Sequence, residues 1–312
     1  MTEAASPGRI AESASVIVVA ICSAPQLRRS LQALLEQKDV AAPQIVVAAD
    51  SRMRGVDAVA AEFPAVVFKQ EAGRDTPLEL TVLGLRSATG ERIVLTEDSC
   101  VARNDWLSGI LATSPEGKGA IGGLVQPMPG ISPAMWAFCF VDFFRYMNPV
   151  TEGPAPTLSV CNVSYRAADL RALAEKWESG FHETVIHDAL RAAHGPLWLT
   201  PRSQVFVRRN VRFRDAVYER YAFGRLFGAT RIARESLARR LLYIAAAPAL
   251  PLLLMRRMSS KARKDPQLMG EFRRALPAIS AMVFAWSWGE WLGYLTGRRP
   301  ARITTAPEID RG

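Results

Sequence analysis

Strand-like and helix-like segments alternate through the first hundred residues, and this alternation constrains the fold more than any other feature. Short apolar runs rich in valine and isoleucine recur at residues 15–21, 44–48, 65–68 and 92–95. Segments with the pattern of helices separate them, at residues 25–37, 54–62 and 75–88. Strands that alternate with helices are typical of a parallel sheet with helices on both faces. We therefore expect an α/β fold with a Rossmann-like, mostly parallel sheet.

The fourth apolar run ends abruptly in polar side chains, because Glu97, Asp98 and Ser99 follow it almost directly. Carboxylates at the end of a buried strand are costly unless they face a cleft and meet a cation. In open α/β sheets, ligands bind at the carboxyl ends of the strands. Oxygen ligands suit Mg²⁺ or Mn²⁺, so these three side chains predict a site for a divalent cation that meets a phosphate group.

Two further carboxylates fit a site for a nucleoside diphosphate. Asp50 ends the second apolar run, where it could accept the imide N–H of a pyrimidine or meet a ribose hydroxyl. Glu183 is expected at the start of a helix over residues 183–193, where the helix dipole favours the ionised form that a general base needs. Complementation of that dipole is the alternative explanation for Glu183. The chain has no Gly-x-Gly-x-x-Gly turn and no Walker loop, so a bound diphosphate would be held by a cation and side chains.

The region after residue 100 is less regular. Its apolar runs predict strands at residues 120–125, 157–165, 197–200 and 204–208. An aromatic-rich segment at residues 132–147 has the composition of core packing. Arg208 and Arg209 follow the last run and could meet a diphosphate, although a solvated surface is the more usual place for either arginine.

The order of these features resembles that of the family 2 glycosyltransferases, which have the GT-A fold. The resemblance extends from about Ser15 to Arg231. The metal motif of the family, Asp-x-Asp followed by Trp-Leu, is similar to residues 97–99 with Trp106-Leu107 behind them. A later motif of asparagine followed by an aromatic residue and arginine is similar to Asn162 with Tyr165-Arg166.

The acidic pair that carries the base in this family resembles His182-Glu183. Two positions depart from the family pattern. Ala49 stands before Asp50, where the family has a second aspartate, and Ser99 stands where the second metal carboxylate is expected. A ligand set with one charge fewer binds a cation more weakly. The Gln-x-x-Arg-Trp motif of processive synthases is absent, so synthesis of a long polymer is not expected.

The resemblance implies an inverting glycosyltransferase that moves a sugar from a nucleotide-diphosphate donor to a hydroxyl acceptor. Glu183 would be the catalytic base. The donor would meet Asp50, Asp98, Arg208 and Arg209, and a Mn²⁺ or Mg²⁺ ion would be held by Glu97, Asp98 and Ser99. The residues expected to line the acceptor site are Asn162, Trp106 and His182.

Charge divides the chain into an ordinary domain and a basic C-terminal module. Residues 225–312 contain 16 Lys and Arg residues against six Asp and Glu residues, whereas residues 1–224 contain 23 against 24. We therefore expect a flexible leader at residues 1–13, a GT-A domain at residues 14–224 and a basic module at residues 225–312. Clustered basic charge indicates phosphate groups, either of nucleic acid or of an anionic membrane surface.

The basic module contains two apolar segments, at residues 241–255 and 276–295. The first is short and interrupted by Pro248 and Pro251, while the second is long enough to span a bilayer. Basic residues flank both segments, so a two-span hairpin would put the most basic loop on the outer side, against the positive-inside tendency. We expect helices that lie in the interface of the cytoplasmic membrane, with the catalytic domain facing the cytoplasm. The acceptor would then be lipid-linked or part of a surface polysaccharide.

Two alternatives remain open from the sequence, and a third is disfavoured. A catalytically degenerate relative could act as a membrane-bound partner protein, and Ala49 and Ser99 favour that possibility. A nucleotidyltransferase would also need a cation on a diphosphate and would differ in its product. Nucleic-acid binding through the basic module is not expected, because its arginines flank tryptophan-rich apolar segments rather than a polar surface.

Overall fold

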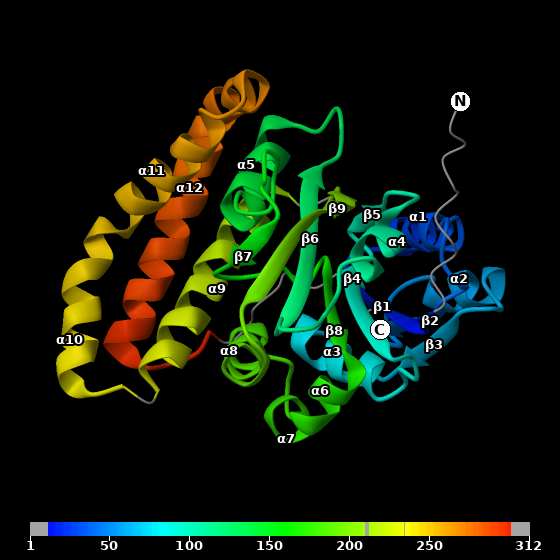
Figure 1. Cartoon of the computed structure of the whole chain (residues 1–312). Helices are drawn as coiled ribbons and strands as arrows, with labels where there is room; N and C mark the ends of the chain where they lie inside the picture. Colours follow the sequence, from blue (N-terminus) through cyan, green and yellow to red (C-terminus); the bar gives the residue numbers. More distant parts are fainter. Residues whose placement is uncertain (1–11, 210–211, 234, 301–312) are drawn as a thin grey trace. The chain divides into compact units, whose positions relative to one another are not determined.

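A computed structural model describes residues 12–209, 212–233 and 235–300. They form two compact units (Figure 1). The sheet unit comprises the described residues up to Gln126 together with Tyr146–Arg208. The helical unit comprises Pro127–Arg145 and the described residues from Arg209 onward. Most of the predicted leader, residues 1–11, lies outside the described residues.

Four parallel strands form one half of the sheet, as the alternating pattern predicts. They are β1 (Ala14–Ala20), β2 (Gln44–Ala49), β3 (Val67–Gln70) and β4 (Arg92–Glu97). Every residue of β1 is buried, which explains why this strand is an unbroken apolar run rather than an alternating one. Between the strands lie α1 (Ala24–Leu35), α2 (Val56–Glu62) and α3 (Pro77–Leu85). Thr76 caps α3, because its side chain accepts a hydrogen bond from the backbone N–H of Glu79.

The strand order places a change of direction beside β1. The parallel strands lie in the order β3-β2-β1-β4, so the chain moves outward from β1 to β3 and then returns to the other side of β1. Right-handed crossovers put α1 and α2 on one face and α3 on the opposite face. This confirms the predicted sheet with helices on both faces. The point of reversal between β1 and β4 is where open α/β sheets bind ligands.

Antiparallel strands extend the sheet beyond β4. Nine strands are found among the described residues, and the order continues β4-β8-β6-β9-β5, with β7 also paired to β9. The added strands are β5 (Cys100–Ala102), β6 (Ala120–Pro127), β7 (Gly153–Ala155), β8 (Val163–Arg166) and β9 (Leu197–Val207). Between and after them lie α4 (Trp106–Leu111), α6 (Ala167–Ala172), α7 (Ala174–Trp177) and α8 (Glu183–His194).

Three of the predicted strands were wrong in extent. The two short strands expected at residues 197–200 and 204–208 are one strand, β9, which continues through Pro201. Proline lacks only the N–H donor, so a strand can tolerate it where that donor is not needed for pairing. The strand expected over residues 157–165 begins only at Val163, because Ser159 and Asn162 form a turn closed by a backbone hydrogen bond of 3.0 Å.

The helical unit is built around two long helices, α9 (Phe213–Ile232) and α12 (Pro266–Thr296). They approach so closely that glycines are required at the contact. A Cβ at Gly289 would lie 2.1 Å from the carbonyl oxygen of Tyr221, and one at Gly224 would lie 2.2 Å from that of Trp286. Gly228 and Gly293 repeat the contact one turn further along. Two small-xxx-small patterns therefore face each other and set the distance between the helix axes.

Buried charges link α9 to α5 (Pro133–Phe143), the aromatic segment of the sequence. Glu219 is fully buried and accepts two hydrogen bonds from Arg209, at 2.6 and 2.8 Å. The neighbouring Arg220 pairs with Asp142 of α5, and both guanidinium groups lie against the ring of Phe138. The aromatic segment therefore forms core packing within this unit, as its composition indicates.

The apolar segments of the basic module differ from the prediction. Among the described residues, one continuous helical stretch, Leu237–Ala262, is long and apolar enough to cross a membrane. It consists of α10 (Leu237–Ala246), a 3₁₀ turn (Ala247–Ala249) and α11 (Leu250–Ala262). Its prolines occupy first turns, where the missing N–H costs nothing, so they do not shorten it as expected. The second segment, expected to be the one that could span, forms the C-terminal part of α12, and much of it is buried against α9.

The glycine contact between α9 and α12 can be tested with a matched pair of substitutions on one helix. Gly289→Ala is expected to lower the free energy of unfolding by about 1–3 kcal/mol, because the new methyl group would meet backbone that must move away. Gly270→Ala is the control, since no atom lies within 4 Å of its Cβ position, and it should stabilise α12 by about 0.5–1 kcal/mol. Thermal unfolding of the two variants measures the difference. Equal midpoints would show that the helices do not pack in this way.

Candidate functional site at the carboxyl edge of the sheet

Asp98 joins the ends of β1 and β4 at the point where the strand order reverses. Its side chain is 1% exposed, and its two carboxylate oxygens accept the backbone N–H groups of Ile21 (3.1 Å) and Cys22 (2.9 Å). These two residues form the turn that leads from β1 into α1. The carboxylate therefore fixes the shape of the loop that borders the switch point.

Burial dominates the electrostatics of this carboxylate. Desolvation raises the pKa of Asp98 to about 7, and the two backbone N–H groups oppose that rise only in part. Both oxygens are already engaged inside the protein. The structure therefore shows Asp98 holding the turn, and its contact with a cation or a donor stays a prediction.

Two hydrogen bonds tie the same edge together. The side-chain amide of Gln26, in the first turn of α1, donates to the carbonyl oxygen of Arg208 (2.7 Å). The N–H of Arg208 donates in turn to the carbonyl oxygen of Ser99 (2.9 Å). The end of β9, the start of α1 and the segment after β4 are thus connected. Arg208 itself is exposed at this edge, which is consistent with its predicted place beside a diphosphate.

Glu97 and Ser99 supply the oxygen atoms that could hold a cation. Glu97 is the last residue of β4 and is half-buried, and the hydroxyl of Ser99 donates to its carboxylate (3.2 Å). Within the described part of the chain, no group of three or more His, Cys, Asp and Glu side chains could hold a metal ion. One carboxylate and one hydroxyl fit an ion that is completed by phosphate oxygens and water, as Mg²⁺ often is. They do not form a closed site made of protein ligands alone.

Asp50 lies where the sequence predicts it, directly after β2, but it has a partner of its own. Its carboxylate accepts from the guanidinium of Arg52 at 2.6 and 3.0 Å and from the backbone N–H of the same residue at 2.8 Å. Hydrogen bonds from Arg52 lower the pKa of Asp50. Since β1 lies between β2 and β4, Asp50 and Glu97 lie at the ends of two strands that are about 10 Å apart. That spacing suits opposite ends of one extended ligand.

Glu183 is the first residue of α8, as predicted, and His182 is its N-cap. The backbone N–H of Phe181, two residues before Glu183, donates to the carbonyl oxygen of Leu78 in the first turn of α3 (3.2 Å). A helix that follows a parallel strand begins at the carboxyl edge of the sheet, so this bond holds the start of α8 near the same edge. The positive end of the α8 dipole stabilises the carboxylate of Glu183.

A buried pair behind Glu183 was not foreseen from the sequence. The hydroxyl of Tyr165 and Nε2 of His187 lie 2.8 Å apart, and both residues are at most 3% exposed. Burial raises the pKa of Tyr165 well above its ordinary value, and the charge of Glu183 contributes to the rise. Burial also lowers the pKa of His187 to about 4. The pair is therefore neutral near pH 7, with an anionic carboxylate close to it.

Trp106 and Asn162 are brought together, but inside the core. The indole N–H of Trp106 donates to the side-chain carbonyl of Asn162 (2.8 Å), and the amide of Asn162 donates to the carbonyl oxygen of Leu124 (2.9 Å). Both residues are 0% exposed. Their polar atoms join α4, β6 and the turn before β8, so these residues brace the sheet in place of the acceptor-lining role expected for them.

Arg209 directly follows Arg208 in the chain and belongs to the helical unit. Its guanidinium is 12% exposed and forms the paired hydrogen bonds with Glu219 described above. The expected role of Arg209 in donor binding has no support from this placement. The neighbours Arg208 and Arg209 thus differ in environment, although nothing in the sequence distinguishes them.

Arg52, Gln26 and the backbone of residues 21–22 are parts of the site that sequence reasoning missed. The Asp50-Ser51-Arg52 spacing could have indicated an arginine folded back on the carboxylate, as in a short turn. The backbone N–H groups gave no signal, because any residue carries them.

The Tyr165–His187 pair predicts a pH dependence of stability. Because burial lowers the pKa of His187 from 6.5 to about 4, the unfolded chain binds a proton over this range that the folded chain does not. The free energy of unfolding should therefore fall as the pH falls from 6.5 toward 4, by at most about 1.4 kcal/mol per pH unit from this group. His187→Gln should remove this contribution, and His194→Gln on the same helix should keep it. Urea unfolding at several pH values measures the slopes; parallel curves for wild type and His187→Gln would contradict the assignment.

Comparison with known proteins identifies the fold. No protein-family model and no curated protein matches the sequence. Among solved structures, the mannosyltransferase PcManGT from Pyrobaculum calidifontis, in complex with GDP-Man and Mn²⁺, matches with a TM-score of 0.53 at 16% identity over 89% of both chains. Residues 1–349 of TarS from S. aureus, in complex with UDP-GlcNAc, match with a TM-score of 0.52 at 14% identity over 93% of both chains. The chain therefore has the GT-A fold of glycosyltransferases, as the motif order predicts.

Proposed function

We propose that this protein is a glycosyltransferase that moves a sugar from a nucleotide-diphosphate donor to a hydroxyl acceptor. The observation that carries the proposal is Glu97 at the carboxyl end of β4, beside a turn fixed by Asp98, at the switch point of a GT-A sheet. The solved relatives of this fold are described with GDP-Man or UDP-GlcNAc, which are both nucleotide-diphosphate sugars. The same class of donor fits the edge between Asp50 and Glu97.

In the proposed site, each end of the donor meets a different strand. Asp50, oriented by Arg52, accepts a hydrogen bond from the base or the ribose. Arg208 lies at the edge next to Ser99, where its positive charge favours the diphosphate. A divalent cation held by Glu97 and Ser99 would neutralise charge on the departing diphosphate. The family pattern places a second carboxylate at Ser99, so this chain should hold its cation weakly unless the donor is present.

Glu183 acts as the base in this proposal. Its carboxylate accepts the proton of the acceptor hydroxyl while the hydroxyl oxygen bonds to the anomeric carbon and the bond from that carbon to the diphosphate breaks. Attack opposite the leaving group inverts the configuration of the sugar. The dipole of α8 favours the ionised carboxylate of Glu183, which must accept the proton. The Tyr165–His187 pair behind it is neutral and adds no second charge.

We also propose that the helical unit attaches the enzyme to the cytoplasmic face of a membrane. The helix Leu237–Ala262 is apolar, and only 11% of the residues in its most apolar window are buried within the protein. Exposed large apolar side chains gather along α10, α11 and α12, with Leu252 76%, Leu237 71% and Trp288 57% exposed. Basic residues flank these helices, which favours an interfacial position over a spanning one. The acceptor is then lipid-linked or part of a surface polysaccharide.

A second candidate is a membrane-bound partner protein that has lost catalysis. Ser99 in the place of a metal carboxylate favours it, since the described residues hold no larger group of metal ligands. Binding of a nucleotide without turnover would support this candidate. A nucleotidyltransferase would instead release pyrophosphate and attach a nucleotide to its acceptor.

The donor site is tested by thermal stabilisation of the purified protein with UDP, GDP, ADP and CMP, each with and without Mn²⁺. One diphosphate at a large excess over its dissociation constant should raise the unfolding temperature by on the order of 5 °C, and only with the cation. Glu97→Gln should abolish the cation-dependent part, while Glu116→Gln, at an exposed turn, should keep it. A shift that does not depend on Glu97 would remove the basis of the proposed cation site.

The proposed base is tested separately, by release of the nucleoside diphosphate from a sugar donor that carries the stabilising nucleotide. Glu183→Gln should slow the release by about 100-fold or more, since general-base catalysis contributes about 10²–10⁴-fold. Its thermal shift with the same donor should match wild type, because Glu183 is not a donor ligand. Glu178→Gln, at an exposed position shortly before α8, is the control. A Glu183→Gln enzyme with the wild-type rate would assign the base elsewhere.

A further inference from the structure

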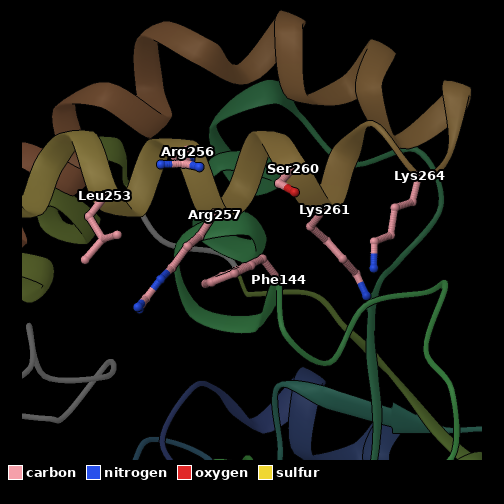
Figure 2. A pocket seen from close by; sticks show the side chains of 7 residues that line it. All are labelled: Phe144, Leu253, Arg256, Arg257, Ser260, Lys261 and Lys264. Atoms are coloured by element: carbon pink, nitrogen blue, oxygen red, sulfur yellow. The ribbon is translucent and has the colours of Figure 1, made fainter.

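The helical unit contains a pocket of about 440 Å³ along α11 (Figure 2). Its lining consists of Phe144, at the end of α5, and six residues of α11 and the turn after it. The six are Leu253, Arg256, Arg257, Ser260, Lys261 and Lys264. Phe144 is 7% exposed and forms an apolar floor, and the guanidinium of Arg145 lies 4.5 Å from the centre of its ring.

Helical spacing explains why these residues meet. Leu253, Arg257, Lys261 and Lys264 are three or four residues apart, so they lie in a row on one face of the helix. Figure 2 shows Arg257, Lys261 and Lys264 extending from the same side of α11, with Phe144 beside them. The row begins at an apolar side chain and ends in cations.

The charge of the pocket selects an anion. Four of the seven lining residues are arginine or lysine, and none of the seven is acidic. Burial lowers the pKa of Lys261 to about 8, together with a smaller contribution from the positive charge of Lys264. Cations that are crowded in this way are stabilised by an anion with several acceptor oxygens, and a phosphate group has that chemistry.

The surroundings of the pocket indicate that the anion belongs to an apolar molecule. The pocket lies at the C-terminal end of the helical stretch Leu237–Ala262, whose leucines are largely in contact with solvent. Leu252 is 76% exposed and Leu253, within the pocket lining, is 41% exposed. An exposed apolar helix that ends in a cluster of basic residues has the chemistry of a membrane surface, where acyl chains adjoin phosphate headgroups.

We propose that the α11 pocket binds the phosphate headgroup of an anionic lipid. Arg256, Arg257, Lys261 and Lys264 contact the phosphate, while Leu253 and Phe144 contact the apolar part next to it. A phosphomonoester fits four cations better than a singly charged phosphodiester, because it carries more negative charge and one more terminal oxygen. This binding site rests on the proposed membrane attachment but not on sugar transfer. A failed lipid-binding test would therefore leave the proposed catalytic activity unaffected.

The test is flotation of the full-length protein with vesicles of phosphatidylcholine that contain either phosphatidic acid or phosphatidylserine, adjusted to equal surface charge. Phosphatidic acid carries the phosphomonoester, so the wild type should bind these vesicles about tenfold more tightly. The double variant Arg257→Gln, Lys261→Gln should lose this preference. The control is Arg263→Gln, Arg273→Gln, which removes the same charge from exposed positions outside the pocket and should keep the preference.

The comparison between lipids separates a pocket from general attraction to negative charge. The proposal is wrong if wild type shows no preference, or if both double variants weaken binding to both lipids equally. In either case the basic residues attract negative charge without forming a specific site. Titration with inorganic phosphate in the absence of vesicles separates the two sources of phosphate. We expect weak, millimolar binding there; micromolar binding would make the pocket a site for soluble phosphate and overturn the lipid assignment.

Discussion

The buried carboxylate of Asp98 is the contact on which the rest of the candidate site depends. Asp98 directly follows β4, next to the end of β1, and it closes the turn after β1 by accepting two backbone N–H groups. Desolvation makes such a group expensive, as its raised pKa of about 7 indicates. The turn that Asp98 closes leads into α1. Gln26 of α1 and the backbone of Ser99 both bind the backbone of Arg208 at the end of β9, so these elements depend on the shape of the turn. Glu97, the adjacent residue, is thereby held at the same edge.

The helical unit depends on a different constraint, the close approach of α9 and α12. Gly224, Gly228, Gly289 and Gly293 allow backbone to meet backbone, so no larger side chain can separate the two helices. The buried pairs Arg209–Glu219 and Arg220–Asp142 then fix α9 against α5. Buried ion pairs add little net stability, but an unpaired partner would be costly, so they favour one arrangement of helices over others. With the core satisfied in this way, α10 and much of α11 leave their leucines exposed.

The sequence predicted the α/β fold because its signals were local and repeated. Each parallel strand is a buried apolar run, and α3 carries its cap at Thr76. The same pattern placed Asp50, Glu97 and Glu183 correctly at the ends of elements. It could not show what their neighbours do, because Arg52, Leu78 and the N–H groups of residues 21–22 become partners only through folding. The family resemblance placed Trp106 and Asn162 at the acceptor site, whereas in the fold the indole N–H of Trp106 donates to the side chain of Asn162 inside the core.

The C-terminal helices show that burial in the fold can override a prediction made by counting apolar residues along the sequence. Counting apolar residues favoured the second segment as the one that could span a membrane, and prolines counted against the first. In the fold, the glycine face of α12 is covered by α9, while the prolines of the first segment fall in first turns that tolerate them. Alongside exposed side chains of α12 such as Trp288, an apolar surface therefore remains along α10 and α11. Its basic end coincides with the α11 pocket, so an apolar helix and a phosphate-sized cluster of cations are parts of one surface rather than two separate features.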